Sequence, residues 1–309
     1  MQIKRRLAAI VSVALVVGAA SWATVGLAGP AGAATEPGGT WGPSQPFPGL
    51  LSKTPLVSGS GAITAITCTA PGDCVAVGYE VPPSGSVATD VPVVVTETDG
   101  TWGSPLEIGG TTGLGSGTTA ELTKVSCSDA GDCAAAGSYD GSGGGLQAFY
   151  ASETNGTWST ATAVKDAGQS TPAGTRIAGV SCTTAGYCTI VGNYTTDSTS
   201  TVNGTTTTTV TDTPFTLDEA QGSWGTPQLV PALASLPQGD ASAILQGVSC
   251  AGPGDCTAGG AYLSAHPTLG TTQPFVISES DGSWGSSAQL VTGLPSGEIT
   301  TISCPDATD

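Results

Sequence analysis

Cysteines occur along this chain in pairs whose two members are six residues apart. Four such pairs are followed by one single cysteine, Cys304, and the first members of successive units lie 59, 55, 68 and 54 residues apart. The pairs are Cys68/Cys74, Cys127/Cys133, Cys182/Cys188 and Cys250/Cys256. A loose period of roughly sixty residues indicates a chain built from repeated supersecondary units.

A short Gly-x-Trp motif recurs between the cysteine pairs. Its tryptophans are Trp41, Trp102, Trp158, Trp224 and Trp284. In the last four copies the glycine follows Asp, Asn or Gln, at 99–100, 155–156, 221–222 and 281–282. Asx-Gly between apolar runs is a strong signal for a two-residue β-hairpin. An apolar residue nine positions before each of these four tryptophans supports one common register: Val93, Phe149, Phe215 and Phe275.

Each unit therefore predicts four strands, which in the first unit are 63–69, 74–79, 91–98 and 101–108. The alternation of apolar and polar residues along them is imperfect, as expected if both faces of each sheet are buried against neighbouring sheets. Four strands per repeat and a period in the blade range predict an all-β fold, a β-propeller of four-stranded blades.

The repeats predict about four complete blades with partial blades at the ends. The complete blades are 63–108, 121–165, 176–230 and 244–291, the partial unit is 299–309, and 34–62 form a linker and an N-terminal closing strand. In the partial unit Asp309 stands where other units have the residue before their second cysteine. We therefore expect the chain to be truncated at its C-terminus, and Cys304 to be half of a local disulfide whose partner comes next.

The N-terminus has the pattern of a secretory signal. The basic segment MQIKRR precedes an apolar run, and Ala31 and Ala33 stand in the A-x-A arrangement of a cleavage site. We predict a signal peptide over 1–33 and a secreted, extracellular protein. The alternative is an uncleaved anchor, because the run is almost long enough to span a bilayer; no later segment is apolar enough to do so.

Charge restricts the partners. After removal of the signal, four cations, Lys53, Lys124, Lys165 and Arg176, would face all 24 acidic residues. Nucleic acid is therefore not an expected partner, because phosphate binding needs a basic surface. An apolar fraction of 39% and the regularly spaced tryptophans are sufficient for a folded core.

The tryptophan hairpin resembles the Asp-box of sialidase-like and related propellers. That motif, S-x-D-x-G-x-T-W, also occupies the turn between third and fourth strands, and its best match here is SESDGSW, 278–284. The match is one residue shorter between Asp and Trp, and two copies lack the Asp. The cysteine-bearing repeat is also similar to those of large secreted actinobacterial propeller proteins of unassigned role. The resemblance implies the fold alone: sialidases hold their substrate carboxylate with three arginines, and the mature chain offers only Arg176.

The Cys-x5-Cys spacing straddles a tight turn, so both cysteines of a pair would face each other across a hairpin. Export supplies an oxidising compartment, and we predict four disulfides, with Cys304 unpaired. Zinc would need four converging ligands and the chain has one histidine, His266, so neither a metal nor a cofactor is expected. Redox catalysis through the pair is the remaining alternative.

An aspartate precedes the second cysteine in three units, at Asp73, Asp132 and Asp255. Such a repeated carboxylate is either a calcium ligand or part of the Gly-Asp chemistry of a turn. We favour the turn.

The loops between the second and third strands lie on one face of a propeller, around its channel mouth, and here they vary in length. Length variation on one face of a repeat array usually marks the binding face. The longest such segment, 195–213, is Thr-rich and is either a projecting hairpin or a flexible, glycosylatable loop.

One register position on this face combines opposite charges. Six residues before each first cysteine stand Ala62, Glu121, Arg176, Ile244 and Glu298. We predict that Glu121, Arg176 and Glu298 line the channel mouth and bind a polar or cationic group. The alternative is chance, since surface positions that share a register are often polar.

These observations favour a secreted binding or surface-interaction propeller whose ligand is a glycan or a protein. One alternative is an extracellular carbohydrate-active enzyme of the glycoside hydrolase type, which would use two carboxylates. Another is a purely architectural repeat module. We assign no catalytic residue, because a Ser-His-Asp arrangement could use only His266, which stands beside Pro267 without a nucleophile-elbow motif.

Overall fold

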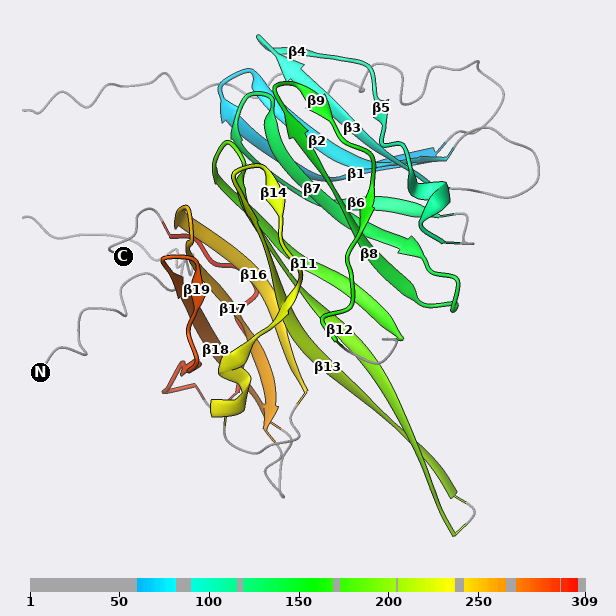
Figure 1. Cartoon of the computed structure of the whole chain (residues 1–309), viewed down its shortest axis with the longest axis vertical. Helices are drawn as coiled ribbons and strands as arrows, with labels where there is room; N and C mark the ends of the chain where they lie inside the picture. The colour runs from blue at the N-terminus through cyan, green and yellow to red at the C-terminus, as the bar shows by residue number, and fades with distance from the viewer. Residues whose placement is uncertain are drawn as a thin grey trace, which may run out of the picture. The chain divides into compact units, whose positions relative to one another are not determined.

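The structure, a computed structural model, describes residues 60–81, 90–115, 119–168, 173–203, 205–236, 242–264, 271–294 and 296–304. All of them belong to one compact unit, Phe47–Asp309. In this part of the chain twenty strands form four antiparallel sheets, joined by two short 3-10 turns (Figure 1). The predicted signal peptide, Trp41, His266 and Asp309 lie outside the described residues.

Each sheet is built from one repeat. The first contains β1 (Ser60–Ala70), β2 (Asp73–Val81), β3 (Val91–Thr98), β4 (Thr101–Trp102) and β5 (Leu106–Glu107). The second contains β6 (Ala120–Asp129), β7 (Asp132–Asp140), β8 (Leu146–Thr154), β9 (Thr157–Trp158) and β10 (Thr162–Ala163). The third contains β11 (Gly174–Thr184), β12 (Tyr187–Val202), β13 (Thr205–Ala220), β14 (Ser223–Trp224) and β15 (Gln228–Leu229). The fourth contains β16 (Ala243–Gly252), β17 (Asp255–Ser264), β18 (Thr271–Ser280), β19 (Ser283–Trp284) and β20 (Gln289–Leu290). The 3-10 turns are η1 (Thr111–Gly113) and η2 (Pro231–Ser235).

The strands of each sheet pair in chain order, the first with the second, the second with the third, and the third with the last two. The first strands of consecutive sheets, β1, β6, β11 and β16, also contact one another in succession. This is the arrangement of consecutive β-propeller blades, with the first strand of each blade innermost. The predicted all-β propeller is confirmed.

The fourth strand of each blade is interrupted, which differs from the continuous strand predicted over 101–108. In the first blade it divides into β4 and β5, and both pair with β3. Between them Gly103 donates its N–H to the Thr96 carbonyl (2.9 Å), while Pro105 has no N–H to donate to a ladder. The outer edge of each blade is therefore two short pieces.

The apolar register predicted from the tryptophan spacing marks the core. Val93, Phe149, Phe215 and Phe275 have no exposed surface. Each pairs with a glycine of the second strand, Gly78, Gly137, Gly192 or Gly260. In the third blade Tyr194 stacks on Phe215 with ring centroids 4.5 Å apart. Second strands are buried along most of their length, which is why their sequences alternate poorly.

The third-to-fourth turns are the predicted two-residue hairpins. Both central residues have positive φ in every blade, for example 50° at Asp99 and 76° at Gly100. Two positive φ values define the type I′ turn, which suits Asn or Asp followed by Gly. The third blade carries Gln221 at the first of these positions, with φ 53°.

Replacing Gln221 with asparagine is expected to raise the free energy of unfolding by about 0.5–1 kcal/mol, because Asn tolerates the left-handed conformation better than Gln. Denaturant unfolding measures the change. The reverse substitution in the second blade, Asn155→Gln, should lower the stability by a similar amount. Equal stability of both variants and the wild type would contradict this account of the turn.

Disulfides close the four predicted hairpins. Cys68–Cys74, Cys127–Cys133, Cys182–Cys188 and Cys250–Cys256 are bonded, with Cα–Cα distances of 3.9–4.0 Å. Cys304 is a free thiol within the described residues. Four disulfides fit an extracellular protein. In the part of the chain that the structure describes, no helix has the length and apolar character needed to cross a membrane.

A serine contact joins the second blade to the third, the third to the fourth, and the fourth to the segment that follows it. The hydroxyls of Ser126 and Ser181 accept hydrogen bonds from the backbone N–H of Cys182 and Cys250, both at 3.0 Å. Ser249 accepts the same bond from Cys304, also at 3.0 Å. Residues 296–304 thus lie against the fourth blade, with Cys304 in the place that Cys182 and Cys250 take against the preceding blades.

Candidate binding site on the loop face

The blades present two different faces. The disulfide face carries the turns between first and second strands and between third and fourth strands. The opposite face, here called the loop face, carries the connections between second and third strands and from blade to blade. Short, uniform turns occupy the first face, and the variable segments occupy the second.

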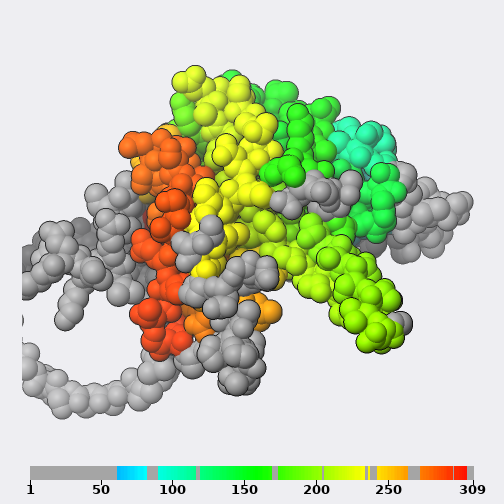
Figure 2. Space-filling view, turned by 60° about the horizontal axis from the view of Figure 1, so that its bottom comes forward, coloured from blue at the N-terminus to red at the C-terminus, as the bar shows by residue number. Residues whose placement is uncertain are grey.

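The Thr-rich segment 195–213 is a projecting hairpin, the first of the two alternatives that the sequence left open. β12 and β13 stay paired from Thr189↔Asp218 to Val202↔Thr205. Their outer parts, 196–203 and 205–211, are exposed on both faces except for partly buried Thr196 and Thr211; we call this segment the arm. It extends beyond the neighbouring strands (Figures 1 and 2). β-branched threonines favour the extended conformation, so the arm needs little burial to stay a strand pair.

A pocket of about 630 Å³ lies on the loop face at the base of the arm. Its walls come from three consecutive blades: β6, β11 to β13, and the start of β16, with Thr300. The lining residues are Lys124, Arg176, Ile177, Ala178, Asn193, Thr195, Val210, Asp212, Ile244, Leu245, Gln246 and Thr300. The lining therefore mixes aliphatic side chains with both signs of charge.

The three residues predicted for the channel mouth have different positions. Arg176 lines the pocket and is exposed. Glu298 accepts a hydrogen bond at 2.8 Å from Gln246, a lining residue. Glu121 accepts a long bond (3.5 Å) from Ser138 on the neighbouring strand and is not among the lining residues. Of the same register, Ile244 also lines the pocket.

Two charged residues of this pocket, Lys124 and Asp212, were not among the three predicted to bind. Lys124 follows a β-bulge in β6. Asp212 lies on β13, where it pairs with Thr195 of β12, another lining residue. One available signal was that Lys124 is one of four cations beyond the predicted signal peptide. The signal for Asp212 was its place in the Thr-rich segment 195–213, which the sequence predicts on this face.

Buried hydrogen bonds fix the floor of the pocket. Asn193, which is 9% exposed, donates from Nδ2 to the Leu245 carbonyl (2.9 Å) and accepts at Oδ1 from the Leu245 N–H (2.8 Å). The Asp212 N–H donates to Ser242 Oγ (2.9 Å). These bonds join the third and fourth blades directly beneath the pocket, so its shape is set before a ligand arrives.

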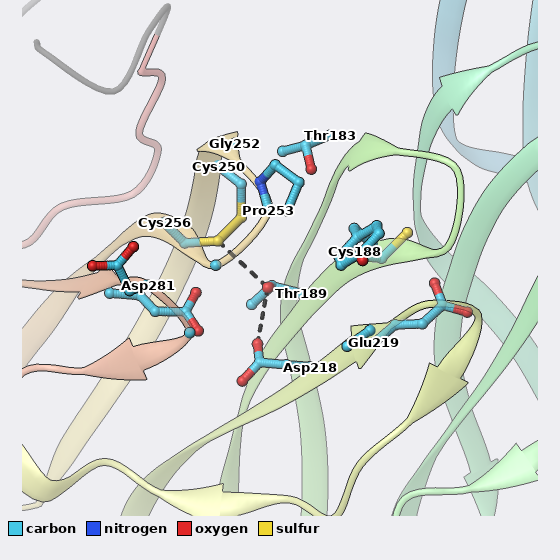
Figure 3. A pocket seen from close by; sticks show the side chains of 15 residues that line it. Thr183, Cys188, Thr189, Asp218, Glu219, Cys250, Gly252, Pro253, Cys256 and Asp281 are labelled. Atoms are coloured by element: carbon cyan, nitrogen blue, oxygen red, sulfur yellow. Dashed lines mark hydrogen bonds between the residues drawn. A yellow bond between two sulfur atoms is a disulfide. The ribbon is translucent and has the colours of Figure 1, made fainter.

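A second cavity, of about 300 Å³, lies on the disulfide face between the third and fourth blades (Figure 3). Thr189 donates to Asp218 Oδ1 (2.9 Å) and its hydroxyl contacts Cys256 Sγ (3.4 Å). Trp284 Nε1 donates to Asp218 Oδ2 (3.3 Å). A cavity of about 340 Å³ with equivalent lining residues lies between the first and second blades. Because the same cavity occurs at two blade interfaces, we attribute it to the way neighbouring blades pack.

A repeated glutamate lies beside these cavities. Glu97, Glu153, Glu219 and Glu279 each pair across the last hairpin with the tryptophan five residues later. Glu153 and Glu279 are 7% and 4% exposed, and their Oε2 atoms have no hydrogen-bond partner. The signal for them was present in the sequence, as a glutamate five residues before each tryptophan from Trp102 onward.

Burial changes the acidity of these carboxyl groups. Desolvation, followed by the charges of Asp218 and Asp255, raises the pKa of Glu279 to about 7. Desolvation, followed by the charge of Asp132, also raises the pKa values of Glu153 and Glu219. At neutral pH these groups therefore bind protons more strongly than ordinary glutamates do.

The aspartates before the second cysteines stabilise turns. Asp73, Asp132 and Asp255 each accept at Oδ1 a hydrogen bond from the first residue of the third-to-fourth turn, at 3.2–3.4 Å. The glycine before each aspartate accepts a second bond from the same turn, as in Gly100 N–H to Gly72 carbonyl (2.9 Å). Within the described ranges, no three His, Cys, Asp or Glu side chains are grouped so that they could hold a metal ion.

Comparison with known proteins adds no family to this description. No protein-family model matches the chain, and no curated protein matches it significantly. The fold class is a β-propeller, and the assignment of a function rests on the pocket and the arm.

Proposed function

We propose that this chain is a secreted β-propeller that binds an extracellular ligand, a glycan or a polypeptide, in the loop-face pocket. The observation that carries the proposal is the position of the pocket at the base of the arm. Three of its lining residues, Thr195, Val210 and Asp212, belong to the hairpin that forms the arm. The longest insertion of the repeat array therefore forms a wall of the loop-face pocket, which is larger than the two cavities of the disulfide face.

Two further features support binding. The pocket has a rigid floor and an open mouth with a mixed polar and aliphatic lining, which is the usual composition of a recognition site. Val210 is 56% exposed on the arm and adds apolar surface that a ligand could bury. The disulfides and the predicted signal peptide fit an extracellular role.

Screening the exported protein on arrays of glycans and of extracellular proteins tests the proposal. The decisive variant replaces 197–210 with Asn-Gly, which joins Thr196 to Thr211 by a tight turn and removes only residues outside the core. We expect the wild type to bind at least one ligand and the arm-less variant to lose at least tenfold in affinity. Ala130→Arg, in a turn of the disulfide face, is the control and should bind normally.

Binding that survives removal of the arm, or that Ala130→Arg abolishes, would move the site away from the loop face. Absence of binding by the wild type to every array member would favour the purely architectural module. Turnover of an array glycan would favour the carbohydrate-active enzyme instead.

A further inference from the structure

Cationic side chains gather in one place on this acidic protein. The whole chain has seven Lys and Arg residues and a formal net charge of −17. Lys124, Lys165 and Arg176 lie in the described residues, and two of these three, Lys124 and Arg176, line the loop-face pocket. The pocket therefore holds two of the three described cations of an acidic protein, together with Asp212 in its lining.

Neither cation is neutralised by the protein within the part that the structure describes. No hydrogen bond or ion pair involves the side chain of Lys124 or Arg176 there. Asp212, the acidic residue of the lining, accepts at Oδ1 a 2.7 Å hydrogen bond from Thr195 on the paired strand. A free ammonium on β6 and a free guanidinium on β11, both in the lining of one pocket, can pair with an incoming anion, and Arg binds a carboxylate with two parallel hydrogen bonds.

We propose that the loop-face pocket captures the C-terminal carboxylate of an extended polypeptide, with Arg176 and Lys124 as the binding residues; this rests on the proposed function. The net charge disfavours polyanions and phosphates, because the field of the whole molecule repels them. A neutral or basic polypeptide is not repelled by the net negative charge, so its single terminal carboxylate can reach the cations of the pocket. The ligand class is thus a neutral-to-basic polypeptide that ends in the pocket.

The arm offers such a chain a backbone partner. β11 pairs with β12 only up to Gly174↔Thr195, and β13 joins its outer neighbour β15 only from Phe215 onward. Among the described strands, the outer edge of β13 over 205–211 therefore has no strand partner. An exposed edge is a template for an added strand, and terminal carboxylates are recurrent anchors of such peptides. Ile177, Val210 and Ile244 supply aliphatic contacts, and the described lining residues include no aromatic ring on which a sugar could stack.

The test uses synthetic peptides attached by their N-termini, each made with a free C-terminal carboxylate and as its amide. A third set is amidated and ends in glutamate, and oligogalacturonate represents a sugar carboxylate. We expect the free-carboxylate peptides to bind the wild type at least tenfold more tightly than their amides. Arg176→Gln and Lys124→Gln should each lose most of this preference, and Arg176→Lys should recover part of it. Lys165→Gln removes the described cation outside the pocket and should change nothing.

Equal binding of acids and amides, or binding indifferent to Arg176→Gln, would overturn the inference while the proposed function stands, provided that removal of the arm still abolishes binding. Preference for amidated peptides that end in glutamate would move recognition to a side-chain carboxylate. Binding of oligogalacturonate alone would replace the polypeptide with an acidic glycan. If the wild type binds no peptide, glycan or array protein, both proposals fail together.

Discussion

Replacing Gly137 with alanine is expected to lower the free energy of unfolding by about 3 kcal/mol or more. A Cβ at this position would overlap the Glu121 carbonyl oxygen and lie 2.7 Å from the Leu122 Cα. Both are backbone atoms of the paired strand, so no side-chain rotation relieves the overlap. Phe149, which has no exposed surface, pairs with Gly137 on the other side and leaves β7 little room to move.

The cause is a bulge that every blade repeats. The register of β6 and β7 shifts between Leu122 and Lys124, and the same shift occurs in the other three first strands. The bulge brings a carbonyl against the glycine of the second strand at Gly78, Gly192 and Gly260 as well. Only glycine fits a backbone approach this close.

Gly143→Ala is the matched control, because an added Cβ there would have no neighbour within 4 Å. Its stability should stay within about 0.5 kcal/mol of the wild type. Thermal or denaturant unfolding of both variants gives the comparison. If Gly137→Ala and Gly143→Ala have the same free energy of unfolding, the close backbone approach at the bulge is contradicted.

The local signals of this sequence were sufficient for hairpins, disulfides and blades. An Asp-Gly turn or a Cys-x5-Cys pair requires only neighbouring residues to adopt its conformation, so it can be read without knowledge of the packing. The break after Trp102 was not predicted, because it depends on which carbonyl of the third strand Gly103 reaches. The long 195–213 segment remained ambiguous, since threonine composition alone suits both a strand pair and a glycosylated loop.

The loop-face pocket was only partly predictable, because its lining depends on contacts between residues far apart in the sequence. Arg176 was found because the repeat register places it at the start of a first strand. Arg176, Ile177 and Ala178 nevertheless all line the pocket, and three consecutive residues can do so only where a bulge interrupts the two-residue alternation of a strand. The equivalent bulge of β6 precedes Lys124, which also lines the pocket, and counting along the sequence could not anticipate either bulge.

Lowering the pH from about 8 to 5 is expected to stabilise the protein by about 1–3 kcal/mol. The main contributor is Glu279, whose pKa is raised from 4.5 to about 7 by burial and then by Asp218 and Asp255. Between pH 4.5 and 7 the folded state therefore holds a proton that the unfolded state has lost. Stability must fall as the pH rises through this window, and it levels off above the folded pKa, where both states are ionised.

The neighbouring groups act in the same direction. Burial also raises the pKa values of Glu153, Glu219 and Asp218, so each favours the folded state at acidic pH. For Asp218 the hydrogen bonds from Thr189 and Trp284 oppose the rise and reduce it. Asp281 also lines the cavity beside Glu279. The carboxyl groups that line this cavity with Glu279 are those of Asp218, Glu219 and Asp281, and protonation reduces their mutual repulsion.

Glu279→Gln separates this effect from the general loss of negative charge in acid. The amide resembles the protonated carboxyl, so the variant should be more stable than the wild type at pH 8 and should lose most of the rise in melting temperature on acidification. Glu97→Gln is the matched control, because Glu97 has the same place in the first blade but is only partly buried. It should keep the full pH dependence. A wild type whose melting temperature is flat between pH 5 and 8 would contradict the raised pKa of Glu279.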